Sequence, residues 1–292
     1  MKINYDLIHD WHELLRDVLK NKYGFDDTAI NSLSEEDLSF KVIYFEERNI
    51  ISKPRTIYES FVFNCPPDML DGWNKLKKSI ANGDNLTPYL SKGINNLDYQ
   101  DKMLNEWGIH HFHLGVNMSG GFIERTGPLL FAFVTEQDFY AINIYKHNDW
   151  AEQTILQIIH DNWPQLISGY KVSNGIKTSE TITPAQRISL REVNANSCFT
   201  VADGTVYMPT GGGSMSSGYN LSTTLKVIKT RNYINSIGEI LDSPPEELKK
   251  GLLSSGYSEC DDIDARLIIS NTGYSVYFPQ NKLLLNIAHP KA

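Results

Sequence analysis

The stretch LLFAFVTEQDFYAINIY, residues 129–145, decides the fold of this chain more than any other part. Its two ends, 129–135 and 139–145, are rich in β-branched and aromatic residues, which favour β-strands. The polar triplet Glu-Gln-Asp at 136–138 suits the turn of a hairpin. The stretch therefore predicts two antiparallel strands joined by a short turn.

The residues on either side extend this hairpin into a sheet covered by helices. Upstream, 109–116 predicts a third strand, and 97–107 predicts a helix ahead of it. Downstream, apolar residues at helical spacing predict a helix over about 149–162. Residues 97–164 thus predict a three-stranded meander with a helix at each end.

The rest of the chain also mixes the two patterns. Helices are expected where apolar residues recur every three or four positions, and strands where β-branched and aromatic residues cluster. The predicted helices cover 5–22, about 67–82, a segment beginning at Pro184 and a long segment after the glycine-rich loop 210–218; the predicted strands are 40–45, 56–63, the hairpin 198–207, and a closing meander of 267–270, 274–278 and 283–287. The fold class is therefore α+β, with antiparallel meander sheets flanked by helices.

Chain length and one polar segment predict two lobes. A chain of 292 residues is long for a single hydrophobic core. Residues 173–180 are rich in Ser, Asn, Gly, Lys and Thr, as linkers are. We expect an N-terminal α+β lobe, 1–172, with the histidine-rich strand, and a C-terminal α+β lobe, 180–292, with the glycine-rich loop.

Composition restricts the class of partner. Hydrophobic residues make up 41% and charged residues 21%, which is typical of a globular protein. The formal net charge is −8 and the pI about 5.5, so the chain repels phosphate backbones at long range. Nucleic acid is therefore disfavoured as a partner, although a local basic patch would still allow it.

Three features predict a cytoplasmic protein. The start of the chain lacks a basic segment followed by an apolar one, so it does not resemble a signal peptide. No apolar run approaches the ~20 residues of a membrane span. Cys65, Cys198 and Cys260 are widely spaced, which suits reduced thiols and not a cysteine-based zinc site. We expect no membrane association, no cofactor and no metal.

The candidate site is a strand with three histidines in four positions, His110, His111 and His113. Because alternate strand residues share a face, His111 and His113 should point the same way. Phe112, Leu114 and Val116 would then be buried on the opposite face, and His111 and His113 would lie on an open surface. Imidazole suits acid–base catalysis because its pKa lies near neutrality.

Polar residues close to this strand complete the candidate site. Arg125, in a glycine-rich loop, is suited to hold a phosphate or a carboxylate with two parallel hydrogen bonds. The third strand ends in Lys146 and His147, which a meander would bring to the same edge. The predicted catalytic residues are His111, His113, Arg125 and His147, and the predicted substrate-binding residues are His110, Lys146, Gly120 and Gly121. The alternative is that these histidines are structural.

The glycine-rich loop 210–218 allows two interpretations. Backbone amides ahead of a helix suit an anion, but the Gly-Lys-Ser/Thr of a P-loop is missing. A mobile loop is the alternative interpretation.

The segment 129–147 resembles the central hairpin of the small RelE/ParE-type toxin fold. It shares an apolar strand, an acidic turn, a second apolar strand and a closing basic or histidine residue. The resemblance covers about residues 105–165 and implies metal-independent RNA cleavage, with His and Arg in acid–base and phosphate-binding roles. The chain departs from that family in charge, because those toxins are strongly basic, whereas Arg125 and Lys146 are the only Lys or Arg residues between Gly108 and Gln165.

Two hypotheses of function follow. The first is an intracellular effector that acts on a nucleic acid or a nucleotide, a toxin or a phage-defence protein with histidine-dependent phosphodiester chemistry. Its assignment as an effector rests on analogy alone. The second is a non-catalytic interaction protein whose acidic surface binds a protein partner, or an antitoxin in the toxin case.

Overall fold

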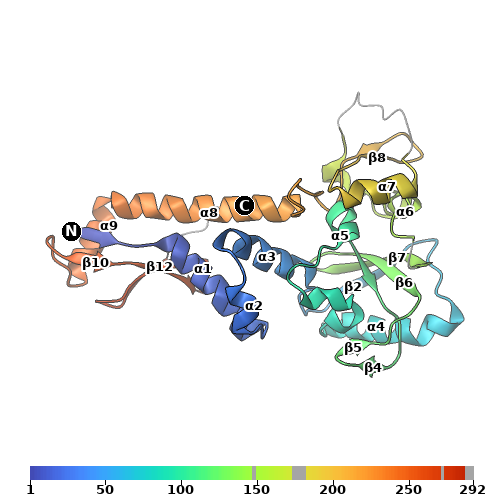
Figure 1. Cartoon of the computed structure of the whole chain (residues 1–292), viewed down its shortest axis with the longest axis horizontal. Helices are drawn as coiled ribbons and strands as arrows, with labels where there is room; N and C mark the ends of the chain where they lie inside the picture. The colour runs from blue at the N-terminus through green and yellow to red at the C-terminus, as the bar shows by residue number, and fades with distance from the viewer. Residues whose placement is uncertain (147–148, 173–181, 271–272, 287–292) are drawn as a thin grey trace. The chain divides into compact units, whose positions relative to one another are not determined.

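The computed structural model describes residues 1–146, 149–172, 182–270 and 273–286, and it has a mixed α+β fold (Figure 1). The chain forms two compact units, one from residues 44–224 and the other from residues 1–43 together with 225–292. This division differs from the predicted lobes. The polar stretch 173–180 lies outside the described residues, and the segments on both sides of it belong to the same unit.

The 44–224 unit is built on a four-stranded sheet in the order β2-β7-β6-β3. β3 (Ile109–Phe112), β6 (Pro128–Val134) and β7 (Asp138–Lys146) are antiparallel neighbours, so the predicted three-stranded meander is confirmed. β2 (Thr56–Glu59) adds a strand that runs parallel to β7. A register shift between Phe131 and Ala132 interrupts the β6–β7 ladder.

Both faces of this sheet are covered, and Figure 1 shows α4 (Leu70–Asn82) and α6 (Thr154–Asn162) on its opposite sides. On one face Phe112, Leu130 and Phe139 pack against side chains of α4. On the other face Ile109 and Phe131 pack against α6 and against α5 (Lys102–Trp107). The expectation that one face of β3 would be open is therefore wrong.

One predicted strand is a helix. Residues 40–45 lie inside α3 (Glu35–Arg48). Leu38, Val42 and Phe45 are buried at a spacing of four and three residues, which is the spacing of one helical face. The start of α3 is marked by Ser34, whose hydroxyl accepts a hydrogen bond from the backbone N–H of Asp37 at 3.0 Å.

Glycines at positive φ end the elements that lead to the site. Gly83 and Gly108, with φ of 77° and 71°, are the C-caps of α4 and α5, as predicted. Gly120 and Gly121, with φ of 59° and 80°, form the two-residue turn between β4 (Met118–Ser119) and β5 (Phe122–Ile123). Positive φ at both central residues is the requirement of a type I′ hairpin turn.

The segment that follows residue 182 packs on the same sheet. α7 (Pro184–Glu192) begins with a capping box between Thr183 and Gln186, as its Thr-Pro start predicted. The short hairpin of β8 (Phe199–Thr200) and β9 (Val206–Tyr207) contributes to the core on the α6 side. Short 3₁₀ turns complete the unit, at Pro67–Met69, Thr87–Tyr89, Lys92–Asn95, Pro164–Leu166 and Ser168–Tyr170.

The glycine-rich loop 210–218 is hydrogen-bonded to the C-terminal end of α5. The backbone N–H of Gly211 donates to the carbonyl of Glu106 at 2.9 Å, and that of Gly213 donates to the carbonyl of Asn105 at 2.8 Å. The Thr210 hydroxyl donates to the Trp107 carbonyl at 2.8 Å. These amides satisfy helix-terminal carbonyls, so neither an anion-binding loop nor a mobile loop describes this segment.

The unit formed by the two chain ends contains α1 (Leu7–Asp17), which continues as a π-helical turn (Val18–Lys22), and the short α2 (Asp27–Asn31). The predicted closing meander is present as the antiparallel strands β11 (Arg266–Ser270), β12 (Gly273–Phe278) and β13 (Leu283–Asn286). β1 (Lys2–Asn4) pairs in parallel with β10 (Asp262–Asp264).

Two further helices come from the C-terminal part of the chain, α8 (Leu221–Asp242) and α9 (Glu246–Ser254). Among the helices of the described residues, none combines the length and the apolar character needed to cross a bilayer.

We predict that Gly211→Ala destabilises the 44–224 unit by at least about 2 kcal/mol, as overpacking against fixed atoms does. A Cβ at this position would lie 2.1 Å from the carbonyl oxygen of Leu104, a backbone atom that cannot move aside. Urea unfolding followed by tryptophan fluorescence reports on this unit, which holds four of the five tryptophans. Gly127→Ala is the control, because its Cβ would meet nothing within 4 Å. Equal urea midpoints for the two variants would show that the close packing of Gly211 on α5 does not contribute to stability.

Candidate functional site

The three neighbouring histidines lie in three different environments. His111 faces a cavity. His110 is 9% exposed and lies on the Phe112 side of the sheet, with the two ring centroids 6.2 Å apart. His113 follows the end of β3 and is 6% exposed, and its Nδ1 accepts a hydrogen bond from the backbone N–H of Thr126 at 3.3 Å. The expectation of two histidines side by side on an open surface is therefore wrong.

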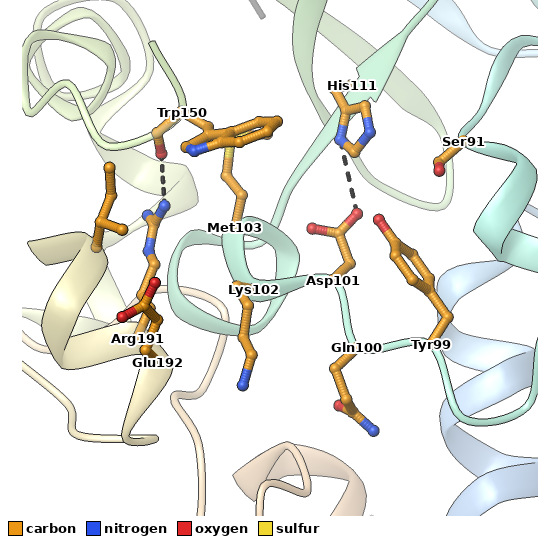
Figure 2. Close-up of a pocket in the computed structure, with 11 residues that line it drawn as sticks. Ser91, Tyr99, Gln100, Asp101, Lys102, Met103, His111, Trp150, Arg191 and Glu192 are labelled. Carbon is orange, nitrogen blue, oxygen red and sulfur yellow. Dashed lines mark hydrogen bonds and ion pairs between the residues drawn. The ribbon is translucent and has the colours of Figure 1, made fainter. Parts of the chain in front are cut away.

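The cavity beside His111 has a volume of about 350 Å³, which is within the range of small-molecule sites. It lies within the 44–224 unit, between α5, β3, the segment before α6 and α7 (Figure 2). The described residues that line it are Ser91, Tyr99, Gln100, Asp101, Lys102, Met103, His111, Trp150, Ile188, Arg191 and Glu192.

The side chains of His111 and Asp101 lie close together at one end of this cavity. The Nδ1 of His111 lies 3.6 Å from Oδ2 of Asp101, and each side chain is 13% exposed. Figure 2 shows the two side chains pointing toward each other, with the Tyr99 hydroxyl beside them. Burial, together with the nearby Asp101 carboxylate, raises the pKa of Tyr99 to about 12. Tyr99 therefore keeps its phenolic proton at neutral pH.

Asp101 is held in place by the start of α5. It is the N-cap of this helix, and its Oδ1 accepts a hydrogen bond from the Leu104 N–H at 3.0 Å. Its own backbone N–H donates to the Tyr44 hydroxyl at 3.0 Å, and that hydroxyl donates to Oδ1 of Asn105 at 2.7 Å. The carboxylate therefore has a fixed position, with Oδ2 left to face His111.

The opposite end of the cavity rests on a buried charge network. Glu106 of α5 forms ion pairs with Arg187 and Arg191 of α7, and both guanidinium groups lie over the Trp107 ring, at 5.3 and 4.5 Å from its centroid. Arg191 also donates to the carbonyl of Trp150 at 2.7 Å, which places the Trp150 indole as a wall of the cavity (Figure 2).

His113 and Arg125 position another wall instead of facing the cavity. The backbone N–H of His113 donates to the Tyr89 carbonyl at 2.8 Å, and Nη1 of Arg125 donates to the Leu90 carbonyl at 2.6 Å. Arg125 also stacks on Phe122 at 5.0 Å. Since Ser91 follows directly, these two residues hold the segment that brings Ser91 to the cavity. The role of Arg125 as a phosphate clamp is not supported by this geometry.

The other predicted residues lie away from the cavity. Lys146 is exposed at the end of β7, opposite Pro128, and β6 separates it from β3. Gly120 and Gly121 form the exposed turn described above. His147 lies outside the described residues. The predicted cluster of His111, His113, Arg125 and Lys146 is therefore not assembled.

The cavity contains residues that the sequence did not single out, namely Ser91, Asp101, Trp150 and Arg191. Asp101 could have been identified from the sequence, since Asp is a typical N-cap residue and Asp101 comes directly before the helical segment. The others carry no local pattern. Within the described ranges, no group of three or more His, Cys, Asp or Glu side chains is placed to hold a metal ion.

No family model matches this chain, and no curated protein or solved structure is significantly similar to it.

We predict that Glu106→Gln lowers the free energy of unfolding by about 3–5 kcal/mol, as the loss of one partner in a buried ion pair does. The substitution leaves two guanidinium groups, 1% and 8% exposed, without their carboxylate. Urea unfolding measures the effect. Glu192→Gln, at an exposed position of α7, should change it by less than about 0.5 kcal/mol. An equally small change in the free energy of unfolding for Glu106→Gln would show that the ion pairs of Glu106 do not stabilise the fold.

We predict that His110 makes the protein less stable in acid. Burial lowers the pKa of His110 from 6.5 to about 4, so below pH 6.5 the unfolded chain binds a proton that the folded chain does not. The stability is intact above pH 6.5 and decreases as the pH falls toward 4, by at most about 3 kcal/mol. Between pH 7.5 and 5.0 the wild type should lose about 2 kcal/mol more than His110→Gln. Parallel losses would show that another group is responsible.

Proposed function

We propose that this chain is an enzyme that cleaves a phosphoester bond in a nucleotide-sized substrate, with His111 as general acid and base. The observation that carries the proposal is the His111–Asp101 pair, 3.6 Å apart, at the wall of a cavity of about 350 Å³. A carboxylate beside Nδ1 fixes the orientation of an imidazole and stabilises its protonated form. The second nitrogen, Nε2, is then available to exchange a proton with a substrate.

The cavity favours a nucleotide over a polynucleotide. Its volume suits one small molecule, whereas a strand needs a long basic groove that a net charge of −8 does not favour. The Trp150 indole offers an aromatic surface for a base. The lining carries two cations, Lys102 and Arg191, and two carboxylates, Asp101 and Glu192, so an anionic group of the substrate would bind beside the cations.

We predict that His111→Gln lowers turnover of a cleaved nucleotide by about 100-fold or more, the usual contribution of a general acid–base group. The first measurement is a thermal-shift screen of nucleoside mono-, di- and triphosphates and cyclic nucleotides, followed by product analysis for any that bind. His160→Gln is the control, since His160 is bonded to Tyr207 at 2.8 Å and does not line the cavity among the described residues. Turnover that survives His111→Gln would exclude the proposed role.

Asp101→Asn refines this test. Asparagine also caps a helix, so α5 should persist while the negative charge beside His111 is lost. We expect reduced turnover with nearly unchanged substrate affinity. An equal loss of affinity would instead indicate a binding role for Asp101.

Induction of the protein in a bacterial host tests the effector part of the proposal. An effector that depletes a cellular nucleotide should arrest growth, and His111→Gln should relieve the arrest at equal abundance. If no nucleotide binds and both forms leave growth unchanged, the non-catalytic interpretation, in which the chain binds a protein partner, is favoured.

A further inference from the structure

We infer that Ser91 is a nucleophile activated by His111, so that Ser91, His111 and Asp101 form a catalytic triad for covalent phosphoester cleavage. The inference deepens the proposed function and rests on it, because it takes His111 as the base. Its basis is the placement of the three side chains around two adjoining cavities.

Ser91 and His111 share two cavities. Both line the main cavity, and both line a second one of about 10 Å³ together with Tyr99, Asp101 and His110. A space of that size holds about one water molecule. Ser91 and His111 therefore face one common small space, the placement that proton transfer between a nucleophile and its base requires.

The orientation of His111 fits this role. Its Nδ1 faces Asp101, and Figure 2 shows its other nitrogen, Nε2, on the side of the ring toward Ser91. This is the order carboxylate, imidazole, hydroxyl that activates a serine, and it is recognised by geometry and not by position in the chain.

The Ser91 hydroxyl is held by the structure around it. It is the N-cap of the turn Lys92–Asn95 and accepts a hydrogen bond from the Gly93 N–H at 3.2 Å. The backbone before it is fixed by Arg125, through the Leu90 carbonyl. A nucleophile placed in this way loses little freedom on reaction.

The reaction proceeds in two steps. In the first, Oγ of Ser91 bonds to phosphorus and its proton passes to Nε2 of His111. The bond from phosphorus to the leaving oxygen breaks, and that oxygen takes the proton from Nε2. In the second step a water gives a proton to Nε2 as its oxygen bonds to phosphorus. The Oγ–phosphorus bond then breaks, and the proton returns to Oγ, so one water is consumed.

A fluorophosphonate probe tests the inference on the full chain, because it phosphonylates an activated serine and releases fluoride. Peptide mapping should locate one adduct on Ser91, formed about 100-fold more slowly in His111→Gln and at the wild-type rate in His160→Gln. The inference is overturned if no adduct forms on Ser91, or if the adduct forms at the same rate in the wild type and in His111→Gln.

A second variant guards against loss of the fold, since Ser91 also caps a turn. Ser91→Cys keeps a nucleophile of similar size, and iodoacetamide should alkylate Cys at this position more slowly when His111→Gln is added. Cys65, Cys198 and Cys260 in the same sample serve as internal references. Equal alkylation rates with and without His111 would again refute the triad.

The two proposals fail separately. If Ser91→Ala remains folded and turns over the nucleotide as the wild type does, the acid–base function stands and the nucleophile is excluded. If Ser91 is labelled in a His111-dependent way but no nucleotide binds or is cleaved, the triad stands and the substrate class is wrong.

Discussion

The buried pairing of Glu106 with Arg187 and Arg191 is the constraint on which the site depends. Ions removed from water are costly unless they are paired, and these side chains are at most 9% exposed. The pairing therefore fixes α7 on the C-terminal end of α5, although Glu106 and Arg187 are 81 positions apart in the chain. The Ser197 hydroxyl, which donates to Glu106 at 3.3 Å, adds the segment ahead of the β8–β9 hairpin to the same network.

α5 connects this ion-pair network to the His111–Asp101 pair. The helix has only six residues, so its first turn and its last turn cannot move independently. Its N-cap is Asp101, its last residues are Glu106 and Trp107, and Gly108 leads straight into β3 and His111. The backbone N–H groups of Gly211 and Gly213 donate hydrogen bonds to the carbonyls at its C-terminal end. One short helix thus joins both ends of the cavity to a rigid sheet.

Local patterns in the sequence were sufficient for elements whose causes are local. The hairpin 129–145 was predicted because strand residues and a turn follow one another directly. α4 and α5 end close to the predicted bounds, 82 and 107, because Gly83 and Gly108 follow them and adopt a positive φ that favours glycine. Residues 40–45 were assigned to a strand since a short apolar run has no period of its own. The helical spacing emerges only when Leu38 and the Ser34 cap are included.

The candidate site was only partly predictable because its chemistry is decided by residues distant in sequence. The strand pattern identified His111 but treated His113 as its equivalent. The difference between them comes from what covers each ring. His111 lies beside Asp101 and faces a cavity, whereas His113 is hydrogen-bonded to backbone groups of residues 89 and 126. His110, with the same side chain, is desolvated, which lowers its pKa to about 4. Three adjacent imidazoles thus receive three different roles from their surroundings, and only the one that meets both a carboxylate and a cavity is equipped for acid–base catalysis.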